Sequence, residues 1–169
     1  MELSYVYSKS ALYTQDGTRI AGLQSFTPPA LTATIGNYKT AWMDMAMPVD
    51  NGMEPMSCNF KVSADSDVLA LFGFIPGSTT RVQARRTYKD SNGELHIFVD
   101  EMQGIIGTLT PDEHGADGKE SVGMSATLNL SYYKLTVDNK EVYEIDPQNM
   151  IRALNGVNVL ADEKDALLM

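Results

Sequence analysis

Residues 124–137 read MSATLNLSYYKLTV and carry the clearest strand signal in the chain. Over residues 124–132 apolar and polar side chains alternate, as they do on a half-buried β-strand whose successive residues point to opposite faces. The apolar set expected against the core is Met124, Ala126, Leu128, Leu130 and Tyr132. The phase then slips by one residue, so that Tyr133, Leu135 and Val137 become the apolar set. Such a slip predicts a β-bulge or a change of packing environment.

The segments around this strand continue the β pattern. Asp138-Asn139 predicts a tight hairpin turn, after which residues 141–145 pair back. On the N-terminal side, residues 95–110 predict one or two strands with Gly104 and Gly107 as kinks, followed by a polar loop over 112–119. Residues 147–169 fit a short strand around Ile151 and a helix over 159–168, but periodicity does not decide this segment.

The N-terminal half predicts further hairpins and one helix. Asp16-Gly17 and the turn over residues 90–93 each lie between β-forming segments, and residues 79–88 and 57–62 predict strands. Residues 26–35 predict a single strand that is entered through Pro28-Pro29. A helix is expected from Asp65 or Ser66 to a stop at Gly73. These elements predict an all-β to α+β fold, a sandwich or barrel, in one domain over residues 1–169.

The segment over residues 36–56 breaks the pattern and is rich in large apolar side chains. It holds Trp42, Met43, Met45, Met47, Met53 and Met56 between several turn residues. An excursion of this length inside a compact domain is typical of a functional loop or hairpin. Two interpretations remain open, since these side chains either fold back onto the domain's own core or form an adaptable docking surface for a partner.

Composition and motifs exclude several classes of protein. The 169 residues include 13 basic and 22 acidic side chains, and this net charge of −9 disfavours a grip on nucleic acid. A single cysteine excludes an internal disulfide, and no apolar run has the length of a membrane helix, so we expect no membrane anchoring. Phosphate-loop, dinucleotide, hydrolase and zinc-protease motifs are absent. We therefore expect no enzyme, and no catalytic, cofactor-binding or metal-binding residues.

Isolated reactive residues do not change this expectation. Cys58 lies on the apolar phase of its strand, as a small core residue does. His114 lies among acidic residues, but their spacing fits no EF-hand. Asp100-Glu101 and Arg85-Arg86 are adjacent pairs, and adjacent strand residues point to opposite faces.

The C-terminal third contains a long ordered motif. From Ser131 the chain reads SYYKL, then VD, EVYEIDPQN and finally NGV at residues 155–157. This series closely resembles the major tail tube proteins of contractile phage tails, in the P2-like family that includes the tube of R-type pyocins. Weaker similarity covers most of the chain, including an N-Y-x-x-A-x-M-D segment over residues 37–44.

The resemblance implies a subunit of two packed antiparallel β-sheets with one flanking α-helix. It implies about six such subunits in a ring, and stacked rings that form a hollow tube conducting DNA during ejection. The implied partners are a tail sheath protein outside, baseplate and tail terminator proteins at the ends, and tape measure protein and DNA transiently in the lumen. The implied place is the virion tail, assembled in the cytoplasm of the host bacterium. Alternatives are the tube of a bacteriocin or contractile injection system and, in a different class, a small ligand-binding β-barrel.

Two sets of candidate functional residues follow from the pattern together with the resemblance. The first set, expected at contacts between subunits and rings, is Tyr38, Trp42, Met43, Asp44, Met45, Met47 and Met53. The second set, expected to face the lumen from the polar side of the strand over 124–132, is Ser125, Thr127, Asn129 and Ser131.

Overall fold

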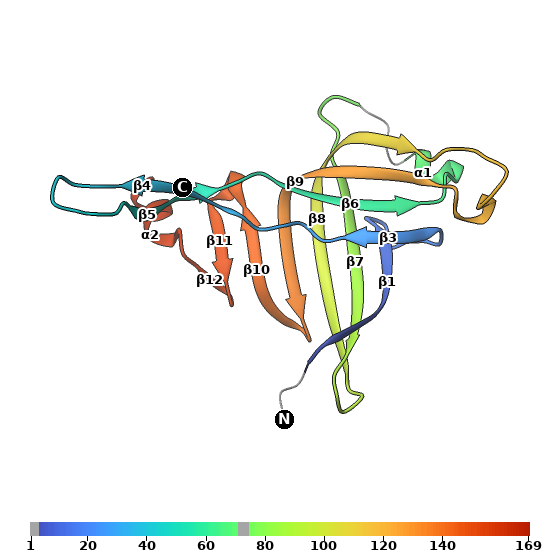
Figure 1. Cartoon of the computed structure of the whole chain (residues 1–169), viewed down its shortest axis with the longest axis horizontal. Helices are drawn as coiled ribbons and strands as arrows, with labels where there is room; N and C mark the ends of the chain where they lie inside the picture. Colours follow the sequence, from blue (N-terminus) through green and yellow to red (C-terminus); the bar gives the residue numbers. More distant parts are fainter. Residues whose placement is uncertain (1–3, 71–74) are drawn as a thin grey trace.

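The computed structural model describes residues 4–70 and 75–169, whose strands form a ten-stranded sheet and a separate two-stranded sheet (Figure 1). In chain order the strands are β1 (Val6–Thr14), β2 (Arg19–Ile20), β3 (Leu23–Thr27), β4 (Ala33–Tyr38), β5 (Met47–Met53), β6 (Met56–Val62), β7 (Thr80–Lys89), β8 (Leu95–Pro111), β9 (Met124–Val137), β10 (Lys140–Asp146), β11 (Ile151–Leu154) and β12 (Val157–Asn158). The main sheet has the order β12-β11-β10-β9-β8-β7-β1-β2, and β6 joins it through β9 and carries β3. Every pairing is antiparallel.

Helical structure is sparse in the part of the chain that the structure describes. It consists of α1 (Ser66–Ala70), α2 (Ala161–Ala166) and the 3₁₀ turns η1 (Lys119–Ser121) and η2 (Pro147–Asn149). Helix α1 begins at the predicted position, whereas its predicted stop at Gly73 lies outside the described residues. Neither of these α-helices has the length and apolar content that crossing a membrane requires.

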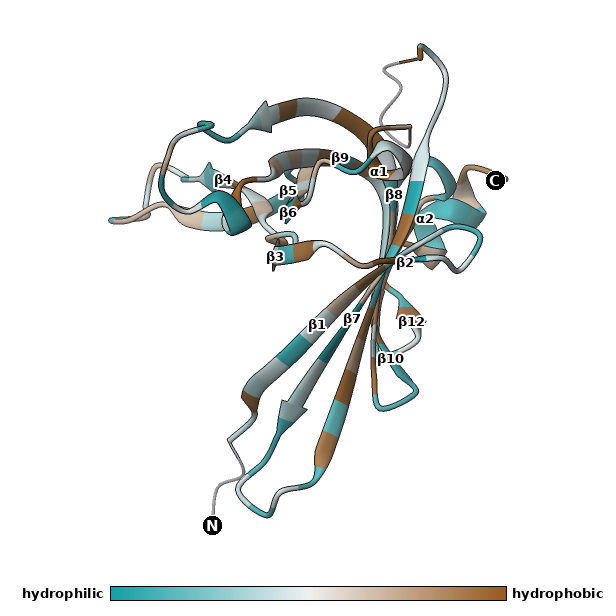
Figure 2. Ribbon diagram, turned by 90° about the vertical axis from the view of Figure 1, so that its right-hand side faces the viewer, coloured by the Kyte–Doolittle hydropathy of each residue, from teal (hydrophilic) through white to brown (hydrophobic). Residues whose placement is uncertain are grey.

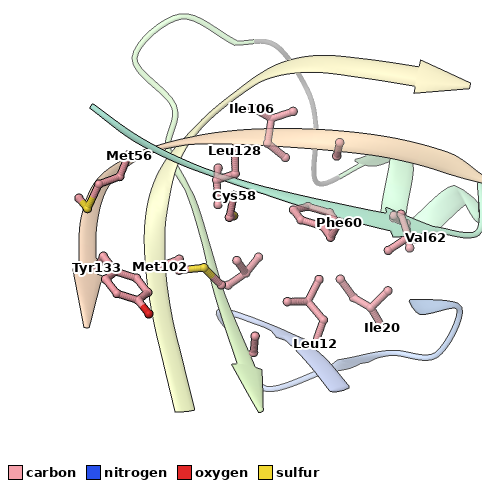
Figure 3. Close-up of a cluster of buried hydrophobic side chains, with 14 of the residues drawn as sticks. Leu12, Ile20, Met56, Cys58, Phe60, Val62, Met102, Ile106, Leu128 and Tyr133 are labelled. Atoms are coloured by element: carbon pink, nitrogen blue, oxygen red, sulfur yellow. The ribbon is translucent and has the colours of Figure 1, made fainter. Parts of the chain in front are cut away.

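The two long strands β8 and β9 bend, and this bend builds the layers. Figure 2 views the sheet of β1, β7 and β10 along its edge, with β8 and β9 curving above it over β3 and β6. The expected packed layers are therefore present, and both come from one hydrogen-bonded sheet. Between them lies the core, where Leu12 and Ile20 face Phe60 and Val62 (Figure 3).

The phase slip in β9 is a β-bulge, as the sequence predicts. Tyr132 lies opposite Gln103 and Leu130 opposite Gly104, so Ser131 is an extra residue in β9. The bulge corrects one expectation: Tyr132 is only half-buried, while Tyr133, at 3% exposure, enters the core in its place.

Gly104 and Gly107 mark the bend in β8, which confirms the prediction of kinks. Ile106 pairs with Leu128 and Thr108 with Thr127, which leaves Gly107 as a second bulge. A Cβ at Gly104 would lie 1.9 Å from the Asn129 carbonyl oxygen, so only glycine fits this close approach.

The strand predicted over residues 26–35 is wrong. The chain leaves the main sheet after Thr27 and starts β4, in the small sheet, at Ala33. Pro28 and Pro29 have no backbone N–H to donate to a ladder, so the pairing with β6 ends there. The residues on the two sides of Pro28-Pro29 therefore belong to different sheets.

The three predicted hairpin turns are confirmed by their backbone angles. Asp138 and Asn139 have φ values of 49° and 65°, the pair of positive angles that a two-residue hairpin turn of type I′ needs. Gly17 and Gly93 have φ values of 83° and 80°. Gly17 closes the β1–β2 hairpin, where its amide donates to the Thr14 carbonyl.

We expect Gly17→Val to lower the free energy of unfolding by about 1 kcal/mol or more, because a left-handed backbone strains a residue with a Cβ. A Cβ at Gly17 meets no atom within 4 Å, so the effect isolates the backbone. Urea denaturation measures it, and Gly115→Val, at an open position without positive φ, is the matched control. Equal stability of the two variants would contradict the prediction.

A buried ion pair joins β7, β8 and β9 inside the core. The Asp100 carboxylate is fully buried and accepts hydrogen bonds from Arg86 Nε at 2.7 Å and Nη2 at 2.9 Å. The Tyr133 hydroxyl donates to the same carboxylate at 2.7 Å, and burial beside Asp100 raises the pKa of Tyr133. Three donors thus compensate the loss of water around one charge.

Candidate functional site

The most prominent surface feature is the hairpin of β4 and β5, which extends away from the main sheet (Figure 1). Its two strands pair only with each other, from Ala33 opposite Met53 to Tyr38 opposite Met47. Residues 39–46 form the tip, where the Thr40 carbonyl accepts a hydrogen bond from the Met43 amide. The hairpin is therefore an arm that shares no strand pairing with the main sheet.

The outer part of this arm exposes large apolar side chains. Trp42 is 84% exposed and Met45 is 76% exposed, which is unusual for side chains of this size. Of the other candidates, Tyr38, Asp44 and Met47 are exposed and Met43 is half-buried. Apart from the half-buried Met43, these residues do not pack on the domain's own core.

The base of the arm behaves in the opposite way. Met53 packs against the core cluster and Met56 is 5% exposed within it. Packing onto the domain's own core is thus correct for the base of the segment, and the outer part stays exposed. Met53, a contact candidate from the sequence, lies where the arm joins the body.

A side-chain clamp fixes the arm to the C-terminal part of the sheet. Arg152 on β11 donates from Nη1 and Nη2 to the two oxygens of Asp50 on β5, at 3.2 and 2.9 Å. This bond lowers the pKa of Asp50. A mainly apolar cavity of about 410 Å³, lined by residues that include Met53, Ile145 and Leu160, lies beside the clamp. Sequence reasoning missed the clamp, because 102 residues separate its partners and neither belongs to a motif.

The four lumen candidates lie on the outer face of β9, away from the core. Ser125 and Asn129 are exposed, and Thr127 is half-buried, with its hydroxyl donating to Asn59 Oδ1 at 2.7 Å. Ser131 is exposed at the bulge and donates to the Gln103 carbonyl at 3.2 Å. The structure therefore brings all four onto one uncharged polar strip.

The residues considered for chemistry make structural contacts. Burial raises the pKa of Cys58 to about 12, so its thiol stays protonated and unreactive. His96 Nδ1 lies 2.7 Å from Asp138 and Nε2 lies 2.9 Å from Asp90, and these carboxylates raise its pKa. Both ring nitrogens are occupied in a clasp between two hairpin turns.

Comparison with known proteins gives consistent matches. A family model described as "Phage tail tube protein FII" matches residues 9–167. The tail tube protein of Escherichia phage P2 is 29% identical over 146 residues, which covers 83% of this chain and 84% of that protein. The major tail tube protein of Serratia phage KSP20 is 27% identical over 154 residues, covering 89% and 88%.

Two solved structures have a similar fold at low sequence identity. A chain of the PVC sheath–tube complex, from an extracellular contractile injection system in its extended state, has a TM-score of 0.58 and 10% identity, covering 76% of this chain and 88% of that one. A chain of the anti-feeding prophage baseplate has a TM-score of 0.54 and 8% identity, covering 75% and 90%.

Proposed function

Since this chain belongs to the phage tail tube protein FII family, we propose that it assembles into rings of about six copies that stack into a hollow tube. The chain is a structural subunit of a contractile tail. We propose that it forms the wall of the tube and has no catalytic role. Among the described residues the main sheet of one copy has an open strand order, so a conduit requires assembly. If each of about six copies supplies about four strands, the closed barrel has a radius near 24 Å at the usual spacing and tilt.

The observation that carries this proposal is the exposed arm on a sheet with open edges. We propose that Tyr38, Trp42 and Met43, together with Asp44, Met45 and Met47, contact neighbouring copies and the next ring, with Met53 at the base. An apolar arm of this kind is a liability in a monomer and is covered in a polymer. Open strand edges also favour association, because their unpaired backbone N–H and C=O groups can pair with a neighbouring copy.

Electron microscopy of the purified protein in negative stain tests the assembly directly. We expect rings or tubes, and size-exclusion chromatography should show large species at the same concentration. A protein that stays monomeric in both measurements would contradict tube formation and favour a small ligand-binding barrel.

The partners that this role requires are a sheath around the tube and proteins that start and end it. We propose a baseplate and a terminator at the two ends, with tape measure protein and then DNA in the lumen of a virion assembled in the host cytoplasm. A net charge of −9 per copy suits a conduit for DNA, because it disfavours phosphate contacts. The same fold occurs in injection systems. Particles with DNA-filled heads would support the phage role, and headless particles the alternative.

We expect a label at Asn129 to appear inside the channel, because Ser125, Thr127, Asn129 and Ser131 are proposed to line it. Since Cys58 is buried, Asn129→Cys provides one reactive thiol for a maleimide–gold cluster. Cryo-electron microscopy of labelled tubes should show added density within the lumen, while wild-type tubes treated in the same way show none. Added density on the outer surface would contradict the assignment.

A further inference from the structure

One end of the main sheet is basic on the face opposite the core. Strands β1, β2 and β7 contain six basic residues and no acidic residue, although the chain as a whole carries −9. Five of the six are exposed on the face opposite the core: Lys9, Arg19, Arg81, Arg85 and Lys89. None of the five forms an ion pair with another described residue.

The opposite end of the sheet is acidic on the same face. Strand β10 places Glu141, Glu144 and Asp146 there, and Lys134 of β9 is the cation beside them, with 4.0 Å between Lys134 Nζ and Glu141 Oε2. Desolvation and the neighbouring Glu141 raise the pKa of Glu144. Glu101 of β8 lies opposite Lys134 on the same face, so one lysine faces four carboxylates and the cluster keeps an excess of negative charge.

Arg85 and Glu141 lie in one row across the sheet but too far apart to form an ion pair within one copy. The register runs across the sheet from Ala11 through Arg85, Val99 and Thr136 to Glu141. Three strand spacings separate Arg85 from Glu141, about 14 Å, which exceeds the screening length of about 8–10 Å in physiological salt. Arg85 and Glu141 therefore do not pair inside the subunit, although Glu101 lies between the two groups and Arg81 lies over the Tyr132 ring.

Both groups border an open part of the sheet edge. Strand β2 pairs only with Leu12 and Tyr13 of β1, so the outer edge of β1 before Leu12 has no partner among the described residues. The short side chain of Ala11 separates the exposed Arg85 from this edge. At the other end, β11 begins its pairing with β10 at Tyr143, which leaves Glu141 beyond the covered part.

We propose that the edge with Lys9 and Arg85 (the basic edge) adjoins the edge at Glu141 (the acidic edge), beside which Glu144 lies on the same face, of the next copy in the ring. The proposal rests on ring formation and adds which surfaces meet. Two unlike edges make a head-to-tail contact that can close a ring. Opposite charges favour this order, and like charges oppose a contact between two basic or two acidic edges.

A charge-reversal pair tests the proposal. Arg85→Glu places a carboxylate in the basic edge, and Glu141→Arg places a guanidinium in the acidic edge. We expect each variant alone to need about tenfold more protein than the wild type for half-maximal assembly, because like charges then meet. A 1:1 mixture should restore assembly, since the two variants can alternate around a ring with an even number of members. Native mass spectrometry should find them in equal numbers.

Matched controls come from η1, which lies in the connection between the inner strands β8 and β9. Lys119→Glu and Glu120→Arg make the same changes in net charge at exposed positions, and both should assemble as the wild type does. The neutral variants Arg85→Gln and Glu141→Gln should show intermediate assembly that salt affects less than in the wild type. Circular dichroism establishes that each variant is folded. If a charge reversal unfolds the chain, the assembly of Arg85→Gln and Glu141→Gln tests the edge contact instead.

Each outcome separates this contact from the proposed function. Wild-type protein that forms no rings would contradict the tube itself. Wild-type rings together with variants that assemble normally, or with folded variants whose mixture stays unassembled, would overturn the edge contact alone.

Discussion

A chain in which residues 36–49 are replaced by Asn-Gly should fold as a stable monomer and form neither rings nor tubes. The exposed candidates on the arm are removed, while Ile35 and Asp50, which face each other across the hairpin, become joined by a two-residue turn. Asp50 keeps its clamp to Arg152, and Met53 keeps its place against the core. Thermal unfolding should stay close to that of the wild type, and sedimentation velocity should show one small species.

A second variant keeps the full length of the arm and changes only its side chains. It tells whether assembly needs the apolar contacts or only the shape of the arm. Trp42→Ser combined with Met45→Ser keeps the arm but removes its two most exposed apolar side chains, and we expect weaker assembly. Asn37→Ser with Lys39→Ser changes two exposed polar residues of the same arm and should leave assembly intact. Tubes of normal length from the shortened chain would show that the arm makes no essential contact.

Replacing Asp100 by Ala should lower the free energy of unfolding by about 3–5 kcal/mol. The substitution leaves the Arg86 guanidinium charged in a mostly buried position and also removes the acceptor of the Tyr133 hydroxyl. Guanidinium or urea denaturation measures the loss, and the variant should be too unstable to assemble at elevated temperature.

Two controls identify the unpaired charge as the cause. Tyr133→Phe removes one hydrogen bond and should cost about 1 kcal/mol. Arg86→Met with Asp100→Leu removes both charges and should be more stable than Asp100→Ala, because no buried charge is left without a partner. If Asp100→Ala unfolds at the same denaturant concentration as the wild type, the ion pair does not contribute to stability.

The sequence was informative where the signal is local. The bulge in β9 was predictable because one extra residue shifts the apolar phase, and Ser131 is that residue. The turn at Asp138-Asn139 was predictable because few residue types accept two successive positive φ angles. The family resemblance rests on the same region.

Features that depend on strand order were not predictable. Alternation over residues 26–35 does not tell which sheet each residue joins, so one strand was expected where β3 and β4 lie in different sheets. The clamp of Arg152 on Asp50 and the separation of charge between β7 and β10 appear only when distant segments are placed side by side. For the same reason, the outer and inner methionines of the arm were separated only by the structure.

The order of the main sheet also gives the filament a direction. Because β1, β7, β8, β9 and β10 alternate, the strands β1 and β10 run the same way. Copies joined through these edges all have the same orientation along the ring axis. The two rims of a ring are therefore chemically different. One rim carries the turns at residues 90–93 and 138–139 that His96 clasps together. A stack of such rings is a polar filament. A protein that starts the filament and a protein that caps it therefore bind two different surfaces.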